Sequence, residues 1–339
     1  MKKYYRNLFL LFGVAAIVVM LCTFEVSYAE LLAHLHRAGG WLPLILGIWI
    51  PIYLLNALSW YLIIRDGESR PVPFRKVFQW TVSGFALNYA TPMGLMGGEP
   101  YRILELTPYV GARKAASSVI LYVMMHIFSH FWFWLSAAFV YVLTRPVDWT
   151  MGLLLTFISA CCLLAIYFFM KGYRHGMAVK TLALCARLPF LKKWAVRFAS
   201  EKAETLRRID MQIAQLHGQR RFTFFASLGL EYLARVVGCL EVYFILLVLT
   251  NNIGFLDCFF IMAFTSLFAN LFFFSPMQLG AREGGFALAS AGVAIPGAYG
   301  VYTGLITRVR ELVWIVIGVL LMKVGNGGCI NSQNNAQKS

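Results

Sequence analysis

Long apolar runs separated by short polar stretches dominate the pattern of this chain. A helix needs about 20 mainly apolar residues to cross the hydrocarbon core of a bilayer. Six runs meet that requirement, and we expect each to be a full span: 7–28, 41–64, 115–144, 149–170, 222–250 and 300–324. The pattern therefore predicts an all-α polytopic membrane protein.

Two further apolar stretches, about 77–98 and 255–298, differ from simple spans because each contains a proline and a glycine cluster and has a glutamate within it or directly after it. Proline ends a helix and glycine permits a sharp turn. The backbone groups freed at such a turn must face protein or a hydrated cavity rather than lipid. We therefore expect two re-entrant helical hairpins. Their tips are predicted at Pro92, Gly97 and Gly98 in the first and at Pro276, Gly284 and Gly285 in the second.

The two stretches share a short motif, which indicates an internal repeat. Thr91-Pro92-Met93-Gly94-Leu95 precedes Glu99, and Ser275-Pro276-Met277-Gln278-Leu279 precedes Glu283, with seven residues from proline to glutamate in both. We expect two inverted repeats of span, hairpin and span, at about 41–144 and 222–324. Such repeats with broken helices are an architecture of transporters, whose substrate site lies near the membrane midplane. A chance match of the motif is the alternative.

Composition supports the membrane interpretation. The 339 residues are 60% hydrophobic and 13% charged, whereas a soluble domain carries roughly 25% charge. The net charge of +15 would suggest a nucleic-acid partner for a soluble protein, but in a membrane chain Lys and Arg collect in cytoplasmic loops. We therefore expect no nucleic acid. The basic residues at positions 2, 3 and 6 place the N-terminus, before an uncleaved first span, in the cytoplasm, and the C-terminus with it.

The segment 171–221 is the most basic part of the chain, with twelve Lys or Arg and three acidic residues. Leu and Phe are interleaved with these charges, so one interpretation is an amphipathic helix or two on the cytoplasmic leaflet. The alternative is charge that only sets topology. Residues 1–325 would form a single transmembrane domain, and the polar residues 326–339 a disordered tail.

Several charged residues fall inside the predicted spans and hairpins, where charge is costly and usually functional. Arginine suits phosphate recognition because its guanidinium donates in a planar fork. We expect these residues to line a cavity for an anionic headgroup. The predicted substrate-binding residues are Glu99, Arg102, Arg235, Arg282, Glu283 and Arg308.

Spacing gives a second, structural interpretation of the same residues, as ion pairs that join helices. Side chains three or four residues apart share a helix face. The pairs expected on this basis are Glu99 with Arg102, Glu231 with Arg235, and Arg308 with Glu311, and Arg310 is a further charged candidate in the last span.

His126 and His130 lie four residues apart on the span 115–144. We expect them to be buried and hydrogen-bonded. Proton coupling, supported by Glu231 and Glu311, and metal binding are the alternatives. No third metal ligand, CxxC pair, Walker A motif or dinucleotide-binding fingerprint is evident, so we expect no metal, no other cofactor and no catalytic residue.

Three features carry a family resemblance. They are the run Pro92-x-x-x-x-Gly97-Gly98-Glu99-x-x-Arg102, the run from Ser275 to Gly285, and Arg308 in the last span. With these motifs the chain resembles the lysylphosphatidylglycerol synthase transmembrane-region family of flippase-like membrane proteins, over nearly its whole length. The resemblance implies lipid translocation. In the fused bacterial relatives, the membrane domain flips aminoacylated phosphatidylglycerol that a soluble domain makes. The family often has a Glu-Arg pair near the positions of Leu121 and Tyr122. This chain lacks that pair, and His126 lies close to its place.

We therefore expect a lipid flippase of the bacterial inner membrane. It would move an anionic or aminoacylated phospholipid or glycolipid headgroup through a charged groove between the repeats. Its expected partners are this lipid and a lipid synthase or glycosyltransferase. The alternatives are a membrane-embedded glycosyl or aminoacyl transferase, with Glu99 or Glu283 as base, and a non-catalytic partner of a synthase.

Overall fold

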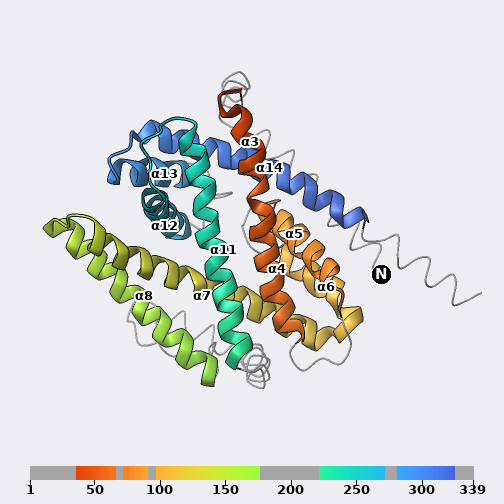
Figure 1. Cartoon of the computed structure of the whole chain (residues 1–339). Coiled ribbons are helices and arrows are strands. Elements are labelled where there is room, and N and C mark those ends of the chain that lie inside the picture. The colour runs from red at the N-terminus through yellow and green to blue at the C-terminus, as the bar shows by residue number, and fades with distance from the viewer. Residues whose placement is uncertain (1–35, 66–71, 91–96, 176–220, 272–280, 325–339) are drawn as a thin grey trace, which may run out of the picture.

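The computed structural model describes residues 36–65, 72–90, 97–175, 221–271 and 281–324. Within these ranges the chain is helical and contains no strand, which confirms the all-α prediction (Figure 1). The predicted first span, the polar tail and most of the basic segment 171–221 lie outside the described residues.

The helices follow one another in a simple order along the chain. They are η1 (Gly39–Trp41), α3 (Leu42–Gly47), α4 (Trp49–Arg65), α5 (Phe74–Ala90), α6 (Gly98–Val110), α7 (Ala112–Thr144), α8 (Trp149–His175), α11 (Arg221–Leu247), α12 (Phe255–Leu271), α13 (Ala281–Gly292) and α14 (Gly297–Val324).

Three helical segments of the described ranges are long and apolar enough to cross a membrane. They are His36–Arg65, Ala112–Thr144 and Trp149–Tyr167, and they correspond to the predicted spans 41–64, 115–144 and 149–170. The helices α11 and α14 lie where the spans 222–250 and 300–324 were predicted and have 27 and 28 residues. Each of these two helices carries charged residues in its interior.

Proline and glycine account for two breaks between consecutive helices. The helix is interrupted at Ile48, between α3 and α4. Pro51 follows three residues later, and its nitrogen has no hydrogen to donate to the preceding turn. Gly111 separates α6 from α7 with a φ of 84°, a left-handed conformation that glycine adopts without steric cost. The chain therefore turns sharply out of the first predicted hairpin into the long helix α7.

The first predicted hairpin contains α5 and α6, which lie antiparallel. The side chain of Asn88, near the end of α5, accepts a hydrogen bond from the N–H of Gly98, the first residue of α6 (2.7 Å). At the other end of the pair, the rings of Trp80 and Tyr109 pack edge to face. The tip itself, with Pro92, lies outside the described residues.

The second predicted hairpin contains α12 and α13, which also contact each other. Gly284 and Gly285, expected at the turn, lie inside α13. A Cβ atom on Gly285 would come within 3.3 Å of the Phe268 ring on α12. This glycine thus permits close packing of two helices, and the tip with Pro276 lies outside the described residues.

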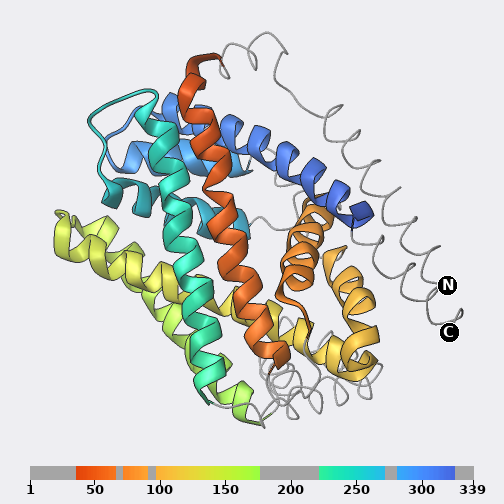
Figure 2. The same cartoon turned by 45° about the vertical axis from the view of Figure 1, so that its right-hand side comes forward.

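The helices α4 and α11 run side by side through the middle of the molecule (Figures 1 and 2). The hydroxyls of Ser59, late in α4, and Ser227, early in α11, lie 2.7 Å apart. At the other end, Ile45, just before α4, shares a cluster with Ile245, near the end of α11. The two helices are therefore antiparallel. The last helix, α14, packs on α5, where the Ser83 hydroxyl donates to the carbonyl of Gly318 (2.9 Å).

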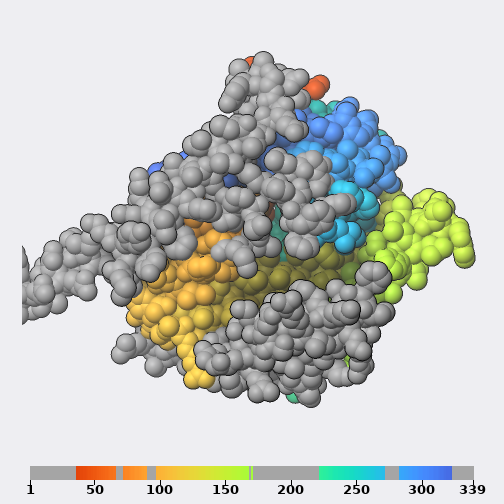
Figure 3. All heavy atoms as spheres, turned by 180° about the vertical axis from the view of Figure 1, so that it is seen from behind, coloured from red at the N-terminus to blue at the C-terminus, as the bar shows by residue number. Residues whose placement is uncertain are grey.

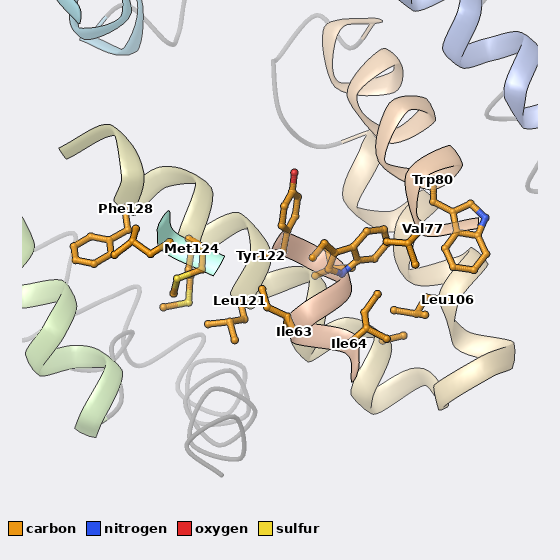
Figure 4. Packing of buried hydrophobic residues seen from close by; sticks show 14 of the residues in the cluster. Ile63, Ile64, Val77, Trp80, Leu106, Leu121, Tyr122, Met124 and Phe128 are labelled. Carbon is orange, nitrogen blue, oxygen red and sulfur yellow. The ribbon is translucent and has the colours of Figure 1, made fainter. Parts of the chain in front are cut away.

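The largest buried cluster joins α4, α5, α6 and α7 (Figure 4). Ile63 and Ile64 of α4 pack with Trp80 of α5 and with Leu121 and Tyr122 of α7. In Figure 4 the Tyr122 hydroxyl points away from the labelled apolar side chains. The apolar cluster thus forms one wall of a region that contains polar groups.

Candidate functional site

Arg102 is the central charged residue of the first helix pair, and only 1% of it is exposed. Its guanidinium carbon lies 4.8 Å from the ring centre of Phe85 and 5.2 Å from that of Tyr122. Its Nη2 donates to the carbonyl oxygen of Thr81 (3.3 Å), and its Nη1 lies 3.6 Å from Oε1 of Glu99. A desolvated cation on an aromatic face gains about 2 kcal/mol. The expected Glu99–Arg102 pair therefore forms, and the rings of Phe85 and Tyr122 pack against its guanidinium.

Glycines let the helices approach closely enough to enclose Arg102. A Cβ atom on Gly84 would lie 2.4 Å from Nε of Arg102, and one on Gly98 would lie 2.1 Å from the carbonyl oxygen of Gly84. Gly97 precedes α6 as its N-cap residue, and Glu99 lies in the first turn. The Asn88 amide donates to Oε1 of Glu99 (2.9 Å). The carboxylate is thus held at a helix N-terminus, where the helix dipole favours negative charge.

A second polar group joins α7 and α11. Nδ1 of His126 lies 2.8 Å from Oε2 of Glu231, which is 1% exposed. Arg235 donates from Nε to the hydroxyl of Ser129 (2.7 Å) and from Nη2 to the carbonyl of His126 (2.5 Å). The expected Glu231–Arg235 ion pair is therefore replaced by bonds from both side chains to α7. His130 packs its ring on Trp134.

A third group joins α13 to α14 through four of the predicted residues. Arg308 donates from Nε to Oε1 of Glu283 (2.9 Å) and from Nη1 to Oε2 of Glu311 (3.4 Å). Arg282 pairs with the other oxygen of Glu311. Gly304 makes room for this contact, since a Cβ there would lie 3.1 Å from Cγ of Glu283. The expected Arg308–Glu311 pair forms as part of this network.

Arg310 and Glu241 form a buried pair, and Glu241 was not expected at the site. Arg310 donates from Nε and Nη2 to the two carboxylate oxygens of Glu241 (2.7 and 3.3 Å), and both side chains are 1% exposed. The Trp49 ring covers the guanidinium at 3.8 Å, and Oε1 of Glu311 lies 3.9 Å from Nη1. The sequence signal for Glu241 was its place, as the second carboxylate after Glu231, within the apolar run of the predicted span 222–250.

Aromatic side chains connect these groups. The ring centre of Phe85, which faces Arg102, lies 5.8 Å from that of His126 and 5.5 Å from that of Tyr53. The Tyr53 ring in turn packs edge to face on Trp314, at 4.8 Å. Tyr53 belongs to α4 and Trp314 to α14. One aromatic layer thus connects α4, α5, α7 and α14.

Several buried polar atoms around Arg102 have no hydrogen-bond partner among the described residues. Such atoms are rare in folded proteins and commonly mark a place where water or a ligand binds. They are Nε of Arg102, the hydroxyl of Tyr122, Nε1 of Trp60, Oε1 of Glu231, Oε2 of Glu99 and Nδ1 of His130. Arg102 contacts the rings of Trp60 and Tyr122, and Tyr122 packs on His126. His126 in turn contacts Glu231 and His130, so these atoms belong to one series of neighbouring side chains.

The structure thus brings the predicted residues together in three groups, each with both signs of charge. Arg102 with Glu99 lies on the first helix pair, Arg235 with Glu231 and the histidines joins α7 to α11, and the Arg308 network joins α13 to α14. His126 is hydrogen-bonded, as expected, but its side chain is 30% exposed rather than buried, and Nδ1 of His130 has no partner among the described residues. Guanidinium groups in such surroundings have the donors to bind a phosphate, and the carboxylates hold them in place.

The family model described as the lysylphosphatidylglycerol synthase TM region matches residues 9–318. No curated protein and no solved structure matches the chain. The match includes both helix pairs and all three charged groups.

Proposed function

Because the chain belongs to the lysylphosphatidylglycerol synthase transmembrane-region family, we propose that this multi-pass membrane protein is a lipid flippase of the bacterial inner membrane. It moves the headgroup of an anionic or aminoacylated phospholipid, or of a glycolipid, through the charged region while the acyl chains stay in the bilayer.

The observation that carries this proposal is the set of buried arginines next to polar atoms that have no hydrogen-bond partner among the described residues. A charge inside a membrane protein costs several kcal/mol unless it is paired, and such charges usually line a substrate path. Arg102, Arg308 and Arg310 are nearly inaccessible, and each has a carboxylate within 4 Å. Between transport events the carboxylates take the place that a phosphate occupies during transport.

The network around Glu311 favours exchange with a phosphate. Three arginines, Arg282, Arg308 and Arg310, lie within 4 Å of this one carboxylate. Glu283, the second carboxylate on Arg308, is 20% exposed, so it is the partner that an incoming anion reaches first. A phosphate that displaces Glu283 keeps Arg308 fully paired and replaces one charge-assisted bond with another.

The helix contacts support two inverted repeats. In one unit α4, the α5–α6 pair and α7 follow one another, and in the other α11, the α12–α13 pair and α14. The contact of α5 with α14 has its counterpart in that of α12 with α7, and the contact of α6 with α7 in that of α13 with α14. The central helices α4 and α11 are antiparallel, which an inverted arrangement requires. Glu99 and Glu283 lie in the first turn of corresponding helices.

The pair of His126 and Glu231 is the candidate for coupling to protons. The imidazole lies against a buried carboxylate and between Phe85 and Tyr122. Arg235 donates to the backbone carbonyl of His126, so this pair lies next to one of the proposed substrate-binding arginines.

Reconstitution in vesicles tests the proposal. A fluorescent phosphatidylglycerol is placed in both leaflets, and a quencher added outside reports the rate at which inner-leaflet lipid becomes accessible. We expect the Arg308→Gln variant to lose about tenfold in rate or more, since a charged hydrogen bond contributes about 1.5–3 kcal/mol. The matched control is Arg113→Gln, an exposed arginine at the start of α7, which keeps the wild-type rate.

One outcome refutes the role of Arg308, and two others refute the flippase itself. Well-folded Arg308→Gln protein with the wild-type rate removes the arginine from the path. A new lipid on thin-layer chromatography, without accelerated exposure of the headgroup, identifies a transferase instead. Neither activity, together with co-purification of a lipid synthase, identifies a non-catalytic partner.

A further inference from the structure

An apolar pocket of about 290 Å³ lies between α7, α8, α12 and α13. It is separate from the charged groups described above. Small side chains such as Ala137, Ala263 and Gly292 create the space, and larger ones such as Ile158 and Leu267 close its walls. None of the five carries a polar side-chain atom.

The pocket opens toward the side of the molecule that faces lipid. Leu154 of α8 and Leu288 of α13 line the pocket and are also 44% and 57% exposed. Figure 3 shows the yellow-green end of the α7–α8 pair at the edge of the molecule, beside the blue atoms of α12 and α13. In a membrane, the medium at this opening is hydrocarbon rather than water.

The pocket has few groups that could retain water, since its lining carries one hydroxyl, that of Tyr141. The indole N–H of Trp134, which lines it, already donates to the hydroxyl of Ser266 (2.9 Å). A water molecule needs two to four polar partners to stay in a cavity. An empty space, in turn, deprives its lining of dispersion contacts. The pocket is therefore suited to a hydrocarbon chain.

A cationic group lies at one end of the pocket. Tyr141 lines the pocket, and Arg145 follows one helical turn later, with 39% of its side chain exposed. Its guanidinium pairs with Asp257, the acidic residue in the first turn of α12. Trp149, which begins α8, is 83% exposed, and exposed tryptophans favour the headgroup level of a bilayer. Arg145 is thus placed where a lipid phosphate lies.

We propose that this pocket binds one acyl chain of a phospholipid whose phosphate lies against Arg145. The charge of Arg145 and the apolar walls match the two ends of such a molecule. The bound chain contacts α13, whose opposite end carries Arg282 and Glu283. The proposal needs only that the helices lie in a membrane, and it does not depend on the flippase activity.

Photo-crosslinking of the full chain in vesicles tests this site. The probe is phosphatidylglycerol with a diazirine in one acyl chain, and mass spectrometry locates the labelled peptides. We expect labels on the α8 and α12 segments around Leu155 and Phe264, which line the pocket. The Gly292→Phe variant should lower this labelling about tenfold, because its side chain enters the pocket from a position with nothing within 4 Å.

The matched control is Gly229→Phe, on α11, where a new Cβ also meets nothing within 4 Å. It should leave the labelling unchanged. A diacylglycerol probe without a phosphate should label the pocket less than phosphatidylglycerol does, and Arg145→Gln should remove that difference. Labelling that is confined to outward residues such as Phe157, or that Gly292→Phe does not change, overturns the proposal and indicates only surrounding bilayer lipid.

Discussion

The pair of Arg310 and Glu241 allows a stringent test of how charge is held inside this protein. Both side chains are 1% exposed, and two hydrogen bonds join them across α14 and α11. The two residues differ in the interactions that each keeps when the other is removed. Arg310 keeps the Trp49 ring at 3.8 Å and Glu311 at 3.9 Å, whereas the contacts described for Glu241 are those with Arg310.

This asymmetry sets the expected magnitudes. Arg310→Met leaves a buried carboxylate without a counter-charge, which costs about 3–5 kcal/mol of unfolding free energy. Glu241→Gln keeps one acceptor oxygen for the guanidinium, so we expect the loss of a charged hydrogen bond, about 1.5–3 kcal/mol. The double variant Arg310→Met/Glu241→Leu removes both charges at once. Replacement of a buried ion pair by apolar residues is often nearly neutral.

The assay is unfolding of the purified protein in mixed micelles with increasing dodecyl sulfate, followed by helical circular dichroism. The wild type, the single variants Arg310→Met and Glu241→Leu, and the double variant form a cycle that gives the coupling free energy between the two residues. We expect the double variant to be more stable than Arg310→Met alone by about 2 kcal/mol or more. Strictly additive losses would refute the reasoning, because they would mean that neither charge depends on the other.

Three further changes test the packing that positions the site. Gly300→Leu should destabilise by about 1–3 kcal/mol through overpacking, because a Cβ there would lie 2.3 Å from a backbone oxygen of α13; dodecyl sulfate unfolding measures it. Gly84→Val should displace Arg102, whose Nε lies 2.4 Å from the site of the new Cβ, and lower vesicle transport about tenfold or more if that arginine binds a headgroup. Ser227→Ala should cost only about 0.6 kcal/mol, since it removes one hydroxyl pair with Ser59 between α4 and α11.

Each of these changes has an outcome that contradicts it. The control for Gly300→Leu is Gly229→Leu, a helical glycine with open space around it, and equal stability of the two would show that close packing of α13 on α14 is unimportant. Wild-type transport by Gly84→Val would exclude Arg102 from the headgroup path. A loss well above 2 kcal/mol for Ser227→Ala would mean that the hydroxyl pair, rather than apolar packing, holds the central helices together.

The sequence by itself determined the helical class, the family and the ends of most long helices. Runs of about 20 apolar residues leave no other stable structure in a bilayer, so α7 and α8 begin and end close to the predicted limits. Proline, glycine and glutamate in the stretches 77–98 and 255–298 also marked the places where a single helix is replaced by two. These signals depend only on residues close together in the sequence, so they predict structure without knowledge of which helices pack together.

Only the tertiary structure decided which charges meet. Spacing predicted the local pairs Glu99–Arg102 and Arg308–Glu311, which form, but it also predicted Glu231–Arg235. There the long-range partners His126 and Ser129 on α7 bind the two side chains instead. Glu241, 69 positions from Arg310, was not expected at all. A charge inside a membrane is costly without a counter-charge. The packing of helices decides which counter-charge lies close enough, and this packing depends on contacts between residues distant in sequence.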